Sequence, residues 1–96
     1  MTGFIARLSV KEGKQADFER LQTELSELTH QHEPDTLVYD VNKSLDTPGS
    51  YVVYARFKNQ AAFDFHQATD FHQRLVPPIL ECLGADMELE FFDFVA

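Results

Sequence analysis

The sequence predicts an α+β domain in which a four-stranded antiparallel sheet carries helices on one face. Stretches whose apolar residues alternate are interleaved with stretches whose apolar residues recur every three or four positions. These stretches follow the order strand, helix, strand, strand, helix, strand. The chain has 96 residues, which is enough for one compact domain and too few for two. We therefore expect a single domain over residues 1–96.

The spacing of the apolar residues changes between the first predicted strand and the first predicted helix. Residues 4–10 alternate in the manner of a strand, and Gly13 marks the turn that follows. From Lys14 the apolar residues form one stripe at helical spacing, with polar residues on the opposite side. The helix is predicted to end near His32, because Pro34 cannot extend it and restricts the residue before it.

Two strands joined by a tight turn are predicted next. Residues 37–43 and 51–58 are rich in the β-branched and aromatic residues that favour strands. Between them, residues 46–49 read Asp-Thr-Pro-Gly, in which proline presets its own dihedral angle and glycine accepts a positive one. The two strands are therefore expected to form an antiparallel hairpin.

The last third of the chain is predicted to hold two helical segments and a final strand. A short helix begins at or near Asn59 and ends near His66, and Thr69 caps the helix after it. Pro77-Pro78 is expected to interrupt that helix or to begin a fresh turn, with its end at Gly84. Residues 87–95 form the last strand. The complete order is that of a ferredoxin-like fold.

The predicted sheet has apolar residues on both faces. Helices cover only one face, so the other face of a monomer should be polar. In the third strand, however, the set Val53, Ala55 and Phe57 alternates with Val52 and Tyr54, so apolar side chains point both ways. We therefore expect a homodimer in which two sheets pack face to face. The alternative is that charged residues on that face keep it sufficiently hydrated for the protein to remain a monomer. These residues are Arg7, Asp40, Arg56, Glu88 and Glu90.

Composition and charge argue against several classes of partner. Sixteen acidic residues against eight basic ones give a net charge of −8, which disfavours nucleic acid and anionic membranes as partners. No apolar run approaches the roughly 20 residues that span a bilayer, and the opening residues lack a signal-peptide pattern. Cys82 is the only cysteine and cannot form an internal disulfide, which fits a reducing compartment. We therefore expect a cytoplasmic protein.

His66 is the strongest candidate for a catalytic residue. It is predicted near the end of a short helix and beside the sheet, where an imidazole can take a proton from a phenol or hydroquinone. The alternative is a histidine that closes the helix and binds a backbone carbonyl. His72 lies in the first turn of the next helix, where the helix dipole disfavours a protonated ring. The four histidines lack the spacing of a metal site, so no metal is expected.

Aromatic residues are candidates for the wall of a pocket around His66. A tyrosine hydroxyl can orient a phenolic substrate, and phenylalanine rings can surround it. The alternative for each ring is packing in the core, which is the usual role of such side chains. The candidate substrate-binding residues are Tyr51, Phe57, Phe63, Phe71, His72 and Phe91.

Several features in a fixed order resemble the antibiotic biosynthesis monooxygenase (ABM) family, and the likeness spans nearly the whole chain. In chain order they are the first helix, Glu33-Pro34 ahead of a strand with Leu37 and Tyr39, the Asp46-Thr47-Pro48-Gly49 turn, the Tyr51-to-Phe57 strand and the alanine-rich helix that ends at His66. The resemblance implies a dimeric α+β barrel in which each subunit holds a cavity between its helices and its sheet.

The resemblance also implies an activity. Characterised members of this family include cofactor-independent oxygenases of quinols and aromatic polyketides, haem-degrading enzymes and an isomerase of a signalling molecule. The expectation is a monooxygenase that needs no cofactor and acts on a small aromatic or quinol substrate, with dioxygen as co-substrate. His66 matches the family's first histidine and would be the proton acceptor.

The sequence departs from the family pattern at four positions. Asp35 replaces a glycine, Ala55 a glutamate, Phe57 a tryptophan and Phe71 a second histidine. The chain has no tryptophan at all, so haem degradation is not expected. The loss of polar groups at Ala55 and Phe57 keeps open a second function, a non-catalytic domain for small-molecule binding or dimerisation. A third possibility is an isomerase of a small carbonyl compound on the same fold, which would need more polar pocket residues than the sequence places.

Overall fold

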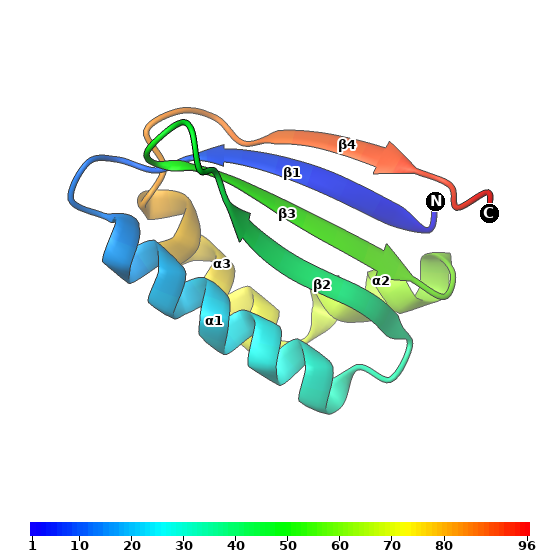
Figure 1. The fold of residues 1–96 in the computed structure, drawn as a ribbon. Coiled ribbons are helices and arrows are strands. Elements are labelled where there is room, and N and C mark those ends of the chain that lie inside the picture. Colours follow the sequence, from blue (N-terminus) through cyan, green and yellow to red (C-terminus); the bar gives the residue numbers. More distant parts are fainter.

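A four-stranded antiparallel sheet with strand order β2-β3-β1-β4 forms one layer of the molecule, and three helices form the other (Figure 1). The computed structural model describes residues 1–96. It confirms the predicted α+β, ferredoxin-like fold. The elements are β1 (Gly3–Ser9), α1 (Gln15–His32), β2 (Thr36–Lys43), β3 (Ser50–Phe57), α2 (Gln60–Ala68), α3 (Asp70–Glu81) and β4 (Glu88–Phe92).

The hairpin between β2 and β3 forms as predicted. Gly49 has a φ of +83°, a conformation that side chains with a Cβ rarely adopt. A Cβ at this position would also lie 3.0 Å from the carbonyl oxygen of Val10. The N–H of Val10 donates to the Gly49 carbonyl at 2.8 Å, which ties the hairpin turn to the end of β1. Glycine is therefore required here by both conformation and space.

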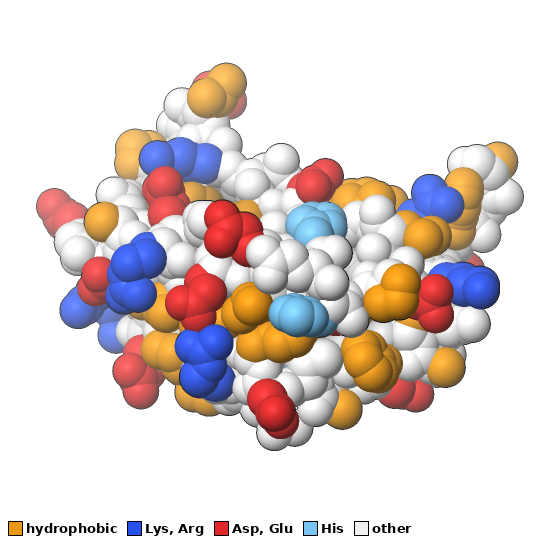
Figure 2. All heavy atoms as spheres, turned by 90° about the horizontal axis from the view of Figure 1, so that it is seen from below, with side chains coloured by type: hydrophobic (Ala, Val, Ile, Leu, Met, Phe, Trp, Pro, Cys, Tyr) orange, Lys and Arg blue, Asp and Glu red, His pale blue; other side chains and the backbone are white.

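The core lies between the sheet and the helices. α1 buries Phe18, Gln22, Leu25 and Thr29, which recur at three- and four-residue steps on one side of the helix. Across the interface, the ring centroids of Phe18 and Tyr51 are 4.6 Å apart. Figure 2 shows the helix face of the molecule, where acidic and basic side chains are mixed with apolar ones. No helix of the protein could span a lipid bilayer.

The junction between α2 and α3 is built by two polar caps. The Asn59 side chain accepts a hydrogen bond from the N–H of Ala62 at 2.9 Å and so starts α2. Thr69 is extended, and its hydroxyl accepts from the N–H of His72 at 3.3 Å while donating to the His66 carbonyl at 3.0 Å. The predicted cap at Thr69 is confirmed. This cap holds the end of α2 and the start of α3 together.

The prediction that Pro77-Pro78 interrupts the helix is wrong, because α3 continues to Glu81. Proline lacks the N–H that would bond to the carbonyl four residues earlier. Those carbonyls belong to Gln73 and Arg74, which are exposed, so water can satisfy them. Burial of Leu75 and Ile79 on the other side of α3 holds the helix together across the prolines.

The last strand is shorter than predicted. β4 ends at Phe92, and the chain then leaves the ladder. The N–H of Phe94 donates to the side-chain oxygen of Thr2 at 2.7 Å instead of to a backbone carbonyl of β1. The guanidinium of Arg56 lies over the Phe94 ring, 3.8 Å from its centroid, and this contact also holds the tail. The alternation of apolar residues over 87–95 is therefore longer than the strand that actually pairs with β1.

The sheet face opposite the helices is bare in the monomer (Figure 1). Its apolar side chains include Tyr54 and Phe92, which are 39% and 41% exposed. Charged groups lie among them, and Arg7 contacts Glu90 at 3.9 Å. The face thus holds both the apolar residues and the charges that the sequence placed there. The face-to-face homodimer stays a prediction.

Sedimentation equilibrium at micromolar concentration tests the homodimer. We expect a dimer for the wild type and a monomer for Tyr54→Glu, because the substitution would bury an unpaired carboxylate between the two sheets. Leu45→Glu is the matched control, since Leu45 is 99% exposed in the hairpin turn. A wild-type monomer, or a Tyr54→Glu dimer of unchanged stability, would contradict the prediction.

Candidate functional site

His66 lies in the last turn of α2 and faces the sheet, as predicted. The residue is 1% exposed. Its ring centroid is 5.5 Å from that of Tyr39 on β2 and 5.4 Å from that of Phe57 on β3. The imidazole is therefore enclosed by aromatic rings from two strands.

A carboxylate that sequence reasoning missed holds the His66 ring. Nδ1 of His66 lies 2.8 Å and 3.0 Å from the two carboxylate oxygens of Glu33. The Thr36 hydroxyl donates to the same carboxylate at 2.7 Å. Nε2 of His66 makes no hydrogen bond within the chain, so it is the ring nitrogen that has no partner. The alternative of a histidine bound to a backbone carbonyl is wrong, because the partner is a buried side-chain carboxylate.

The position of Glu33 follows from how α1 ends. The N–H of Glu33 still bonds to the Thr29 carbonyl at 2.9 Å, and Pro34 then stops the helix. The N–H of Thr36 bonds to the Glu33 carbonyl at 3.2 Å, which turns the chain into β2. A carboxylate at a helix C-terminus is electrostatically unfavourable, because the dipole is negative there. An acidic residue directly before the proline was therefore a signal in the sequence that Glu33 has another role.

A cavity of about 210 Å³ lies beside His66, between the sheet and the three helices. Three of the predicted site residues line it together, namely Phe63, His66 and His72. Most of its wall is apolar, and several of the apolar lining residues are buried in the core. The other lining residues are Phe4, Ala6, Leu8, Gln22, Leu25, Tyr39, Val53, Gln67, Val76, Ile79, Leu80, Met87 and Leu89.

His72 contacts His66 at the wall of this cavity. Their ring centroids are 4.7 Å apart. Burial, and next the nearby His66, lower the pKa of His72 to about 4, against an ordinary value of 6.5. His72 is therefore neutral at neutral pH, as the sequence indicated, although burial rather than the helix dipole is the main cause.

Four other predicted substrate-binding residues do not line this cavity. Phe57 packs against His66 and against Phe63, with ring centroids 5.3 Å apart in the second pair. Phe91 packs on the outer side of Phe63 and is half exposed. Phe71 packs against His32, 5.9 Å between centroids, and Tyr51 lines a separate groove. Their roles in substrate binding stay predictions.

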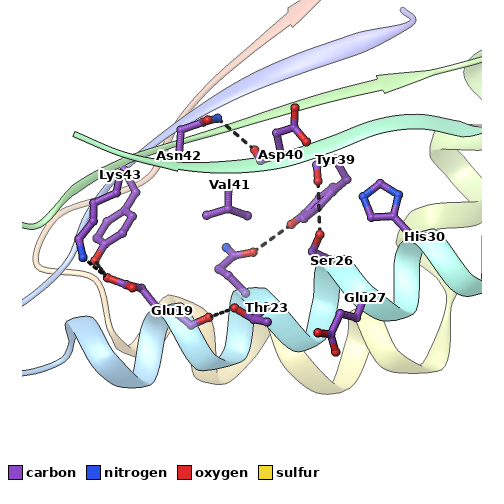
Figure 3. A pocket seen from close by; sticks show the side chains of 12 residues that line it. Glu19, Thr23, Ser26, Glu27, His30, Tyr39, Asp40, Val41, Asn42 and Lys43 are labelled. Carbon is purple, nitrogen blue, oxygen red and sulfur yellow. Dashed lines mark hydrogen bonds and ion pairs between the residues drawn. The ribbon is translucent and has the colours of Figure 1, made fainter. Parts of the chain in front are cut away.

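The separate groove lies between α1 and β2 and measures about 460 Å³ (Figure 3). At one end, Glu19 accepts a hydrogen bond from the Tyr51 hydroxyl and contacts Lys43 at 2.9 Å. The hydrogen bond from Tyr51, and after it the contact with Lys43, lower the pKa of Glu19. Burial, and after it the hydrogen bond to Glu19, raise the pKa of Tyr51 to about 12. Although this groove is larger, it contains no histidine held by a carboxylate. We therefore regard the cavity beside His66 as the candidate site.

No three histidine, cysteine, aspartate or glutamate side chains gather as a metal-binding cluster. The absence of a metal cofactor stays a prediction. What the site can do with its own residues is move a proton, because a carboxylate orients an imidazole whose second nitrogen is free.

Comparisons with known proteins agree with this fold. The model of the family "antibiotic biosynthesis monooxygenase" matches residues 1–77. A crystal structure of an antibiotic biosynthesis monooxygenase is 32% identical, with a TM-score of 0.89 and full coverage of both chains. A Caulobacter crescentus CB15 protein that carries the same family's name is 26% identical, with a TM-score of 0.93 and coverage of 98% of this chain and 89% of that one.

A third similar structure is a conserved protein from Methanosarcina mazei Go1. It is 26% identical, has a TM-score of 0.85, and the match covers 94% of this chain and 90% of that chain. No curated protein matches the sequence.

The lowered pKa of His72 predicts a specific pH dependence of stability. Between pH 6.5 and 4 the unfolded chain binds a proton at this residue that the folded chain does not. The contribution of His72 is therefore fully present above about pH 6.5 and is lost as the pH falls toward 4. The free energy of unfolding can be measured by urea unfolding at several pH values, followed by circular dichroism. Between pH 6.5 and 4 it should fall less steeply for His72→Asn than for the wild type. Gln73→Asn, an exposed neighbour, is the control, and an equal slope for His72→Asn and the wild type would refute the assignment.

Proposed function

This chain belongs to the antibiotic biosynthesis monooxygenase family, and on that basis we propose that it is a cofactor-independent monooxygenase of a small aromatic or quinol substrate. The observation that carries the proposal is the buried Glu33–His66 pair, whose imidazole borders an apolar cavity. Dioxygen is the co-substrate. The proposal requires no metal or flavin.

The first chemical step is proton transfer to His66. A phenolic hydroxyl in the cavity donates its proton to Nε2, the nitrogen that the protein leaves free. Glu33 accepts the hydrogen bond from Nδ1–H, which keeps the ring in the required tautomer and stabilises the imidazolium that forms. Thr36 holds the carboxylate in place. Glu33 is thus a positioning residue and His66 the general base.

The second step is the reaction of the phenolate with dioxygen. The phenolate is electron-rich enough to transfer an electron to dioxygen, and a carbon–oxygen bond then forms between the two. The resulting ring peroxide takes back the proton held by the His66 imidazolium and loses water, the second hydrogen coming from the ring carbon, so that phenol and dioxygen give a quinone and water and His66 is regenerated. The four electrons that reduce dioxygen all come from the substrate, and no other reductant is consumed. The apolar wall of the cavity suits both a neutral ring and dioxygen.

A second candidate function, isomerisation of a small carbonyl compound, is favoured by the contact between His66 and His72. Two imidazoles on one cavity can remove a proton from one carbon and return it to another. The sequence left this reaction without enough polar groups, but the structure adds Gln22 and Gln67 to the same wall. It ranks second because only His66 is held by a carboxylate.

Dioxygen consumption by the purified protein tests the proposed function. With a panel of quinols and phenols of one to three rings, we expect uptake by the wild type and a loss of about 100-fold or more for His66→Ala. Glu33→Gln should retain part of the activity, because Nε2 is still present but less well oriented. His30→Ala, on the exposed side of α1, is the control.

The other outcomes separate the alternatives. Full activity in His66→Ala, with unchanged folding by circular dichroism, would remove His66 as the base. Exchange of substrate C–H with deuterium from water, without dioxygen uptake, would indicate the isomerase. Binding of the compounds without either reaction would indicate a non-catalytic binding domain.

A further inference from the structure

The cavity beside His66 lacks any side chain that could neutralise an anion. None of the sixteen residues that line it is a lysine or an arginine, and none is an aspartate or a glutamate. Its polar lining consists of the amides of Gln22 and Gln67, the imidazoles of His66 and His72, and the hydroxyl of Tyr39. That hydroxyl already donates to the Gln22 amide oxygen at 3.1 Å.

The charged group that contacts the imidazole of this site has the wrong sign for an anionic ligand. It belongs to Glu33, which is 3% exposed and contacts His66 from behind the cavity wall. With its carboxylate ionised, the Glu33–His66 pair is neutral when the imidazole is protonated and negative when it is not. The pair therefore never presents an uncompensated positive charge. An anion entering the cavity would lose its water and gain no counter-charge.

No basic side chain lines the cavity, and several of them have partners elsewhere. Arg7 and Arg56 lie on the bare face of the sheet, in contact with Glu90 and Phe94. Arg74 pairs with Glu24 at 2.8 Å, and Lys11 donates to the Glu81 carbonyl at the end of α3. The net charge of −8 adds a repulsive field around the whole chain.

The size and the entrance of the cavity restrict the ligand further. A cavity of about 150 Å³ in another protein is known to take benzene, so 210 Å³ suits one ring or two fused rings. The exposed lining residues are Leu80, Met87 and Leu89, which are 43%, 39% and 44% exposed, together with the polar Gln67. We take these residues as the entrance, which is thus mostly apolar and carries no charge.

From this cavity we infer that the site accepts uncharged phenols or hydroquinones of one or two rings and rejects the same rings bearing a carboxylate or a phosphate. The inference rests on the proposed function, since it names the substrate class of the same site. A neutral hydroxyl can still reach Nε2 of His66. The phenolate that proton transfer forms lies beside the imidazolium that has just taken its proton, so its charge is compensated where it arises, whereas a carboxylate or phosphate elsewhere on the ring faces no cation.

Binding of three matched compounds under nitrogen tests the inference without turnover. The compounds are 2-naphthol, 6-hydroxy-2-naphthamide and 6-hydroxy-2-naphthoate, and the last two have nearly equal size but differ in charge. By isothermal titration at pH 7.5 we expect the naphthol and the amide to bind with similar affinity, and the carboxylate to bind at least about 30-fold more weakly than the amide. A fourth compound, a hydroxyanthracene with three rings, tests the size limit and should bind more weakly than the naphthol.

A charge placed at the entrance provides the reciprocal test. Leu89→Lys should improve carboxylate binding by about tenfold and leave amide binding almost unchanged, because the new ammonium faces the ligand. Leu45→Lys makes the same change of net charge at a residue that is 99% exposed in the hairpin turn, and it should have no effect.

The outcomes distinguish this inference from the proposed function. Equal binding of the amide and the carboxylate, or no binding of any naphthol, would overturn the inference. The expected preference without dioxygen uptake would support the inference and overturn the monooxygenase proposal.

Discussion

The contact between Glu33 and His66 is the interaction on which the candidate site depends. Both side chains are almost fully buried, and they lie 33 positions apart in the sequence. A buried carboxylate without a partner is strongly destabilising, and a buried imidazole without one adopts no defined tautomer. Together with Thr36 they satisfy each other, and the ring is left with one free nitrogen at the cavity. The fold therefore produces a candidate base without a metal or a bound group.

The fold brings these residues together through the ends of its helices. Pro34 stops α1 where Glu33 can turn inward, and the Thr69 cap ends α2 just after His66. The sheet supplies the aromatic wall, through Tyr39 and Phe57. Because the helices cover one face only, the same sheet also presents a second, mixed face to the outside (Figure 1). The site and the predicted dimer interface thus lie on opposite sides of one layer.

Much of the fold was predictable because its signals are local. The alternating strand residues, the turn at Gly49 and the cap at Thr69 each act within a few positions. Predictions failed where tertiary packing outweighs a local rule, as at Pro77-Pro78, where burial of Leu75 and Ile79 maintains the helix. The site was predicted only in part. Phe63, His66 and His72 were expected near one another and do line one cavity, while their roles stay predictions. Glu33 was missed, since its contact depends on how α1 and α2 pack and not on any spacing in the sequence.

The protonation of the two His66 ring nitrogens tests the central claim most directly. Long-range ¹H–¹⁵N correlation NMR of the labelled protein at neutral pH distinguishes a protonated nitrogen from a bare one. If Glu33 orients the ring as a base, Nδ1 carries the proton and Nε2 is bare. In Glu33→Leu, where Nδ1 has no acceptor, the spectrum should shift toward a mixture of tautomers. A proton on Nε2 in the wild type, or a spectrum unchanged in Glu33→Leu, would contradict the role assigned to this pair.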